Sequence, residues 1–141
     1  MVQLVAPGVF PTQIELHLDR MLIRVLIAQD DVLDLTVPSD QLGKQRGSDL
    51  VEHKQTLITV HARGQGIDIE SLVDTTDVEA VTEAEIDAAV ETLEDAGSIE
   101  YANTKARDLV QRGKDRLEVL PDNEARDLLF QVADYLIERG Y

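Results

Sequence analysis

The sequence predicts an all-α fold of packed helices. Apolar residues recur at helical spacing in several segments, and glycines and prolines separate those segments. The core has to be mostly aliphatic, because the 141 residues include two Phe, three Tyr and no Trp, and aliphatic cores suit helices. Nothing in the pattern indicates a parallel sheet or an internal repeat.

The first predicted helix runs from about residue 12 to Leu35. Thr12 is a suitable N-cap, and the helix should stop before Pro38, because the residue preceding proline avoids the helical region. Its apolar face is Ile14, Leu18, Met21, Leu22, Val25 and Leu26.

The next stretch, "TVPSDQLGKQRGSDLVE" at residues 36–52, is predicted to be an unusually long loop. It contains one proline, two glycines and no sustained periodicity, and long loops in compact domains are usually functional or disordered. The segment "TLITV" at 56–60 is ambiguous, since its β-branched residues favour a strand. Its place between helices favours a helix, which we expect to end at Gly64 and Gly66.

Three later helices are indicated by their start and stop signals. Thr82 and Glu85 form a capping box, and Gly97 supplies a C-terminal stop. Ser98 is expected to cap the next helix, which Pro121 ends, and Asp122 to cap the last one. The inward face of the last helix is predicted to be Leu128, Leu129, Val132, Ala133, Leu136 and Ile137.

The composition excludes several classes of protein. The net charge is −15, from 28 acidic and 13 basic residues, so the surface repels nucleic acid and anionic membranes. Scarce lysine in so acidic a chain predicts adaptation to a high-salt cytoplasm. The alternative is a merely acidic protein of a mesophile. Without cysteine, disulfides and thiolate chemistry are excluded. No apolar run is long enough for a membrane span, and the N-terminus lacks the features of a signal peptide, so we expect a cytoplasmic protein.

Three aspartates in "QDDVLDLT" are candidate metal ligands. On a helix Asp30 and Asp34 lie one turn apart on the same face, with Asp31 about 100° away at its edge. Magnesium is usually held by one or two carboxylates together with substrate phosphates. A solvated acidic face would look the same, but Lys44 and Lys54 follow within twenty residues. Aspartates that face lysines in a long loop suit a Mg–diphosphate site.

The stretch "DDVLDLTVPSDQLGKQRGSDLVEHKQTL" closely resembles the second aspartate-rich region of the trans-type polyprenyl diphosphate synthases. Their pattern is FQ-x-x-DD-x-x-D, followed by G-K-x-x-G-x-D-L-x-x-G-K-x-T-L. The three aspartates match, and the loop residues match in order and spacing: Gly43, Lys44, Gly47, Asp49, Leu50, Lys54, Thr56 and Leu57. The likeness continues to the C-terminus, so the expected domains are a divergent segment at 1–25 and a C-terminal synthase part at 26–141.

The resemblance implies an incomplete isoprenoid-synthase helical bundle with Mg²⁺ as cofactor. In this family an allylic prenyl diphosphate ionises, and the double bond of isopentenyl diphosphate attacks the carbocation. The implied metal residues are Asp30, Asp31 and Asp34, with Asp31 a ligand or an outer partner. Lys44 and Lys54 would hold diphosphate oxygens, while Asp49 and Thr56 would orient the loop and the lysines.

The chain departs from the family pattern at three places. Leu26-Ile27 replaces Phe-Gln, and His53 replaces the glycine before the second lysine. The family's first aspartate-rich motif is absent from the 141 residues, which resemble only a C-terminal half. We therefore expect a prenyltransferase-family chain that is inactive alone and forms a homodimer or pairs with another synthase chain. The alternative is a non-catalytic helical partner or a remnant of a split gene.

The other polar residues are given ordinary roles. His17, His53 and His61 show no ligand clustering and are expected at the surface. A solvated helix face is expected for Glu83, Glu85, Glu91 and Glu94. Loop or cap roles suffice for Ser39, Ser48 and Ser98.

Overall fold

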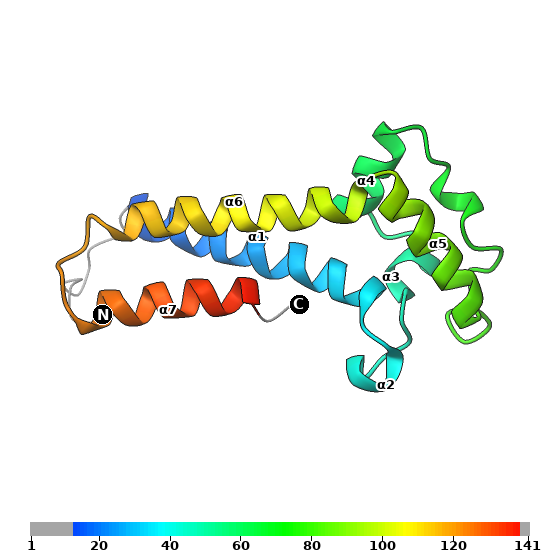
Figure 1. Cartoon of the computed structure of the whole chain (residues 1–141), viewed down its shortest axis with the longest axis horizontal. Coiled ribbons are helices and arrows are strands. Elements are labelled where there is room, and N and C mark those ends of the chain that lie inside the picture. Colours follow the sequence, from blue (N-terminus) through cyan, green and yellow to red (C-terminus); the bar gives the residue numbers. More distant parts are fainter. Residues whose placement is uncertain (1–12, 139–141) are drawn as a thin grey trace. The chain divides into compact units, whose positions relative to one another are not determined.

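A computed structural model describes residues 13–138, without the side chains of residues 13–19 and 22. Within that part of the chain the regular elements are all helices, which confirms the predicted all-α class (Figure 1). The helices form two compact units, residues 27–105 and residues 1–26 with 106–141. The expected domain boundary at residue 25 falls inside a helix that continues through it.

The unit of residues 27–105 contains most of the short helices. It takes the last part of α1 (Gln13–Thr36), then α2 (Ser39–Leu42), α3 (Ser48–Val51), α4 (Leu57–Gly64), the 3₁₀ turn η2 (Ile69–Ser71), α5 (Glu83–Asp95) and the start of α6 (Ser98–Leu117). One cluster of buried aliphatic side chains joins these elements, and its most enclosed members include Ile58, Ile86 and Leu93. The short helices therefore share a single core.

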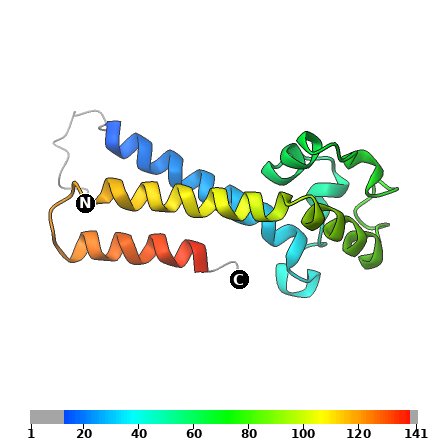
Figure 2. The ribbon, with the colours of Figure 1, turned by 45° about the horizontal axis from the view of Figure 1, so that its top comes forward.

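The other unit is built from three helical segments. The early part of α1, the later part of α6 and α7 (Glu124–Glu138) run alongside one another, with α6 antiparallel to the other two (Figures 1 and 2). Their shared buried cluster is Val25, Val110, Ala133 and Leu136, with Leu109 and Ile137 packed against it. Each of the three segments thus contributes an apolar stripe.

Side-chain hydrogen bonds explain where the two helices α4 and α5 begin. The Thr82 hydroxyl accepts a hydrogen bond from the amide of Glu85, whose carboxylate accepts one from the Thr82 amide, so the predicted capping box is confirmed. Thr56 and Thr59 form the same reciprocal arrangement at α4. That cap settles the ambiguous "TLITV" segment as helix, because it satisfies amides that a helix start leaves open.

Three details of the sequence prediction are wrong. The loop at 36–52 contains two single-turn helices, α2 and α3. Ser98 is the first residue of α6 rather than its cap, since the Tyr101 amide donates to the carbonyl of Gly97. At α7 the capping side chain is Asn123, which accepts from the Arg126 amide, whereas Asp122 pairs with the Arg126 guanidinium.

The inward face predicted for α7 is partly wrong as well. Ala133 and Leu136 are buried, but Leu128 and Val132 are 59% and 45% exposed. The cause is that α7 has apolar residues on two sides, and only one side packs within its unit. The predictions for Thr12, and for the side chains of Ile14, His17, Leu18 and Leu22, lie outside the described residues. No described helix is long and apolar enough to cross a membrane.

Candidate functional site

The last two turns of α1 carry the three aspartates in three different environments. Asp30 is exposed, Asp31 is half-buried and Asp34 is completely buried. This gradient follows from the helix, because Val32 and Leu35 point into the core and bring the intervening Asp34 beneath the following loop. The site lies wholly within the unit of residues 27–105.

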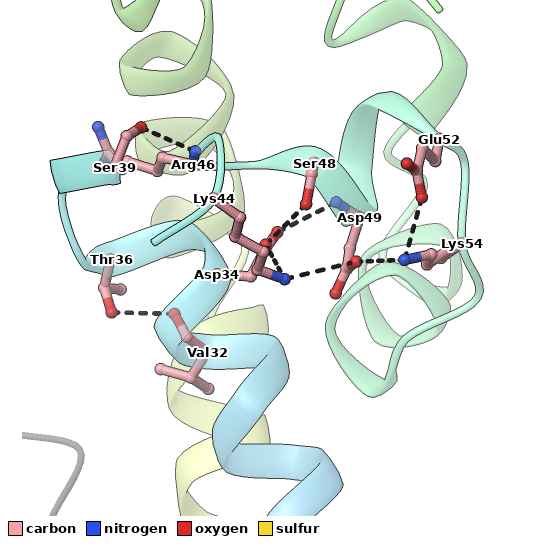
Figure 3. A network of polar contacts seen from close by, with 10 residues as sticks. All are labelled: Val32, Asp34, Thr36, Ser39, Lys44, Arg46, Ser48, Asp49, Glu52 and Lys54. Carbon is pink, nitrogen blue, oxygen red and sulfur yellow. Dashed lines mark hydrogen bonds and ion pairs between the residues drawn. The ribbon is translucent and has the colours of Figure 1, made fainter. Parts of the chain in front are cut away.

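Asp34 is the centre of a polar network between α1 and the loop (Figure 3). Its Oδ1 accepts from Lys44 Nζ at 2.7 Å and from the Ser48 hydroxyl at 3.0 Å. The Asp49 amide donates to Asp34 Oδ2 at 3.1 Å, and the Gly47 amide donates to the Asp34 carbonyl at 2.8 Å. The three donors to the carboxylate oxygens offset the cost of burying the Asp34 side chain.

Asp49 extends the network toward solvent. Its Oδ1 accepts from Lys54 Nζ at 2.7 Å and lies 3.9 Å from Lys44 Nζ, while Lys54 also contacts Glu52 at 3.0 Å. Acid and base therefore alternate from Asp34 through Lys44 and Asp49 to Lys54 (Figure 3). The hydrogen bond to Asp34 raises the pKa of Lys44, and the bonds to Asp49 and Glu52 raise that of Lys54.

A tight turn brings Lys54 back to Asp49. The Lys54 amide donates to the Asp49 carbonyl at 2.9 Å, and His53 has φ of +56°. Among the described residues other than glycine, only His53 has a positive φ. Left-handed backbone favours glycine, and this explains physically why the family pattern has glycine at this position. Thr56 then follows as the cap of α4 and so fixes where the turn ends.

Burial and neighbouring carboxylates disfavour the ionisation of Asp31. Burial raises the pKa of Asp31 to about 6, and the nearby carboxylates of Asp49, Asp30 and Asp34 add to the rise. A backbone hydrogen bond from Leu57 acts in the opposite direction. A bound cation would favour the charged form of Asp31, because it would offset the repulsion from its acidic neighbours.

Arg46 was not predicted as a site residue, yet it ties the loop to two helices. Its Nε donates to the carbonyl of Leu35 at 2.6 Å, and Nη1 lies 2.6 Å from Asp87 and 3.4 Å from Glu83 on α5. Ser39 accepts from the Arg46 amide and donates to Glu83. Glu83 was predicted to be a solvated surface residue, but it also contacts Ser39 and Arg46 of the loop. The family pattern did not indicate Arg46, because residue 46 falls at a position where the pattern G-K-x-x-G specifies no residue type.

Part of the predicted set comes together and part does not. Asp34, Lys44, Asp49 and Lys54 lie in one network. Among the side chains that the structure describes, no three acidic or histidine groups are gathered to hold a metal ion. Carboxylate oxygens are ligands that fit Mg²⁺, and Asp30 is exposed while Asp31 is half-buried.

The described histidines do not join the site, but His61 is not a plain surface residue. Its Nδ1 lies 3.0 Å from the buried Ser98 hydroxyl, and its ring stacks on Tyr101 with centroids 4.2 Å apart. This contact joins α4 to the start of α6 and serves packing within the unit.

The part of the chain that contains the candidate site is similar in sequence to known proteins. The family model "Polyprenyl synthetase" matches residues 27–93, which include every predicted site residue. The chain is 63% identical over 118 residues to a geranylfarnesyl diphosphate synthase of Natronomonas pharaonis, covering 84% of this chain and 33% of that protein. It is 45% identical over 112 residues to a geranylgeranyl diphosphate synthase of Methanosarcina mazei, covering 79% and 33%.

Solved structures agree with the sequence relatives. A geranylgeranyl pyrophosphate synthetase from Geoglobus acetivorans matches with a TM-score of 0.65 and 33% identity, over 82% of this chain and 33% of that one. A geranylgeranyl pyrophosphate synthetase from Pyrococcus horikoshii matches with a TM-score of 0.75 and 28% identity, over 90% and 39%. The chain spans about one third of the length of the curated relatives named above.

Proposed function

Because this chain belongs to the polyprenyl synthetase family, we propose that residues 27–93 form the part of a prenyltransferase that binds a magnesium–diphosphate group. The family joins an allylic prenyl diphosphate to isopentenyl diphosphate in isoprenoid biosynthesis. The observation that carries the proposal is the acid–base network of Asp34, Lys44, Asp49 and Lys54 beside the two accessible aspartates. The carboxylates suit the positive metal ion, and the lysine amino groups suit the negative diphosphate.

Asp30 and Asp31 are the proposed first ligands of Mg²⁺. Asp30 is exposed and free to approach an ion. Burial and acidic neighbours raise the pKa of Asp31, and a cation beside it would favour its charged form. Asp34, the third predicted ligand, is already held by Lys44, Ser48 and the Asp49 amide. It would contact an ion only after exchanging Lys44 for it.

Lys44 and Lys54 are the proposed diphosphate ligands. Their side chains are 41% and 54% exposed, so each amino group keeps donors for a phosphate oxygen while bonded to an aspartate. Asp49 orients both lysines in this proposal, and Thr56 fixes the end of their loop by capping α4. When bound, Mg²⁺ would neutralise charge that develops on the leaving diphosphate.

A non-catalytic helical partner of another synthase chain is a second candidate. It is favoured by the exposed apolar side chains of Leu128, Val132 and Tyr135 on α7, and by the single DDxxD sequence in the 141 residues. Large exposed apolar patches mark association surfaces. A homodimer is proposed from these exposed side chains, and adaptation to high salt from the net charge of −15. A cytoplasmic location stays a prediction from the sequence.

Calorimetric titration with inorganic diphosphate in the presence of MgCl₂ tests the proposed site. Wild-type chain should bind, Asp30→Ala and Lys54→Ala should bind about tenfold more weakly or not at all, and both changes leave the buried Asp34 untouched. Asp95→Ala and Lys105→Ala are matched controls, since they remove an exposed charge of the same sign elsewhere in the unit. Equal binding by Asp30→Ala, Lys54→Ala and the controls would refute the site.

Turnover separates the two candidate functions. The purified 141-residue chain should form no product from labelled isopentenyl diphosphate with several allylic primers, because one aspartate-rich helix provides only half of the clamp that ionisation requires. Addition of a complete synthase chain whose own activity has been removed should restore product if this chain is a catalytic partner. Robust turnover by a monomer, with mass checked by light scattering, would contradict the expectation.

A further inference from the structure

One face of α5 receives the loop that carries Lys44. Glu83, Ile86 and Asp87 are three and four positions apart, so they lie together on the helix surface. Glu83 contacts Ser39 and Arg46, Asp87 contacts Arg46, and Ile86 lies against Gly47. We call these three residues the α5 seat.

Arg46 is the main polar contact on the α5 seat. Its side chain is 14% exposed, and its guanidinium bridges the Leu35 carbonyl on α1 and Asp87 on α5. Its amide donates to the Ser39 hydroxyl at 2.9 Å, which holds the start of the same loop. A planar fork of donors is suited to fixing several acceptors at once.

Gly47 is the apolar contact on the α5 seat. A Cβ at this position would lie 2.5 Å from Ile86 Cδ1, so the backbone approaches α5 as closely as glycine permits. The Gly47 amide meanwhile donates to the Asp34 carbonyl. The backbone at Gly47, three residues after Lys44, is thus held between the end of α1 and the α5 seat.

We infer that Arg46, docked on the α5 seat, is a positioning residue that sets where Lys44 stands for a diphosphate group. A lysine is a flexible point charge, and its position depends on the backbone that carries it. A single residue, Gln45, separates Lys44 from Arg46. This role rests on the proposed function and assigns a contribution to α5, which supplies no ligand in that proposal.

Affinity for inorganic diphosphate with MgCl₂ measures this role in the full chain. Arg46→Ala should weaken binding about tenfold, as loss of an outer partner typically does. Asp87→Ala, which removes an exposed carboxylate that contacts Arg46, should weaken binding about two- to fivefold. Asp95→Ala on the same helix should have no effect, and Arg46→Lys should recover part of the affinity, because it keeps the charge near Asp87 but not the fork.

Testing Arg46→Ala in a chain that also carries Lys44→Gln separates a positioning role from a general loss of stability. Lys44→Gln keeps an N–H donor for Asp34 but removes the charge that the diphosphate would meet. Arg46→Ala should weaken binding much less in the Lys44→Gln chain than in wild type, because residues that act through each other are not additive. Equal losses of affinity in the two backgrounds would overturn the inference.

Amide hydrogen exchange in the ligand-free chain provides the readout that does not depend on the proposed function. In Arg46→Ala the amides of Gly47 and Asp49 should exchange at least about tenfold faster, while those of α4 keep their protection. Unchanged exchange at both amides would overturn the inference. If wild-type chain fails to bind magnesium diphosphate, the proposed function fails, and exchange still decides whether Arg46 holds the loop.

Discussion

The two compact units differ in charge and in how they cover their apolar side chains. Residues 27–105 contain 18 acidic and 5 basic residues, whereas residues 1–26 with 106–141 contain 10 and 8. The acidic unit leaves Ile27 and Val60 exposed among its large apolar side chains, and the near-neutral unit leaves six: Ile23, Leu26, Val119, Leu128, Val132 and Tyr135. These counts refer to the side chains that the structure describes.

The differences in charge and in exposed apolar side chains indicate that the two units have different physical roles. The acidic unit encloses its own core and holds the candidate site, so its sequence is constrained by packing and by charge at the same time. The near-neutral unit has an apolar face left over on α7, and exposed apolar faces of this kind favour association with a further surface. The acidic surface, by contrast, keeps like-charged chains apart.

The largest expected contrast is between a core leucine and a surface leucine. Leu93→Ala should lower the free energy of unfolding by about 2–5 kcal/mol, because Leu93 is completely buried in the core of residues 27–105. Leu128→Ala, at a side chain 59% exposed on α7, should change it by less than about 0.5 kcal/mol. Urea unfolding in molar KCl measures both. A comparable loss for Leu128→Ala would show that another surface covers α7 in solution.

A pair of glycines tests how tightly the site loop packs on α5. Gly47→Ala should cost about 1–3 kcal/mol more than Gly43→Ala, because only Gly47 lies against buried Ile86. Both glycines have φ of +74°, so the backbone strain introduced by alanine is common to the two variants and cancels. Thermal melts compare them. Equal midpoints would mean that Ile86 moves aside freely.

Salt should stabilise the acidic unit more than the near-neutral one. Raising KCl from low to molar concentration should increase the thermal midpoint by about 4–8 °C, equivalent to about 1 kcal/mol, because screening relieves repulsion within residues 27–105. Residue-resolved hydrogen exchange should place the gain in α4 and α5 rather than α7. A flat or falling midpoint would contradict adaptation to high salt.

The smallest expected effect concerns Asp31. Its pKa of about 6 is raised above the unfolded value, so folding favours the protonated acid, and the charged form destabilises the fold above pH 6. Asp31→Asn should therefore raise stability at pH 7.5 by about 0.5–1 kcal/mol after allowance for solvent screening. The gain should fade as pH falls from 6 and vanish near pH 4. A gain that persists at pH 4 would assign it to packing instead.

The sequence predicted the helices well where their signals are local. Thr82 with Glu85 marks a helix start through groups three residues apart, and the structure forms that box. Asn123 was missed as a cap because Asp122 beside it is an equally good acceptor. Leu128 and Val132 were misplaced because a helix that is apolar on two sides does not reveal which side its neighbours cover.

The site was predictable from its motif but its supports were not. Asp34, Lys44, Asp49 and Lys54 stand at fixed spacings that identify the family, and they meet in one network. Asp87 is 41 positions from Arg46, and neither residue type nor spacing predicts that contact. The assignments of Asp30 and Asp31 to magnesium and of the lysines to diphosphate remain predictions.

The short span of the Asp34 contacts has a consequence for the order of folding. Ser48 and Asp49 lie 14 and 15 positions from Asp34, so closing this loop is fast and entropically mild, whereas the contact of Arg46 with Asp87 must wait for α5. Contacts formed before the transition state alter the refolding rate, and later ones alter the unfolding rate. Ser48→Ala should therefore slow refolding, and Asp87→Ala should chiefly accelerate unfolding, in stopped-flow denaturant jumps. The lysine loop would then be tethered to α1 before α5 docks against it.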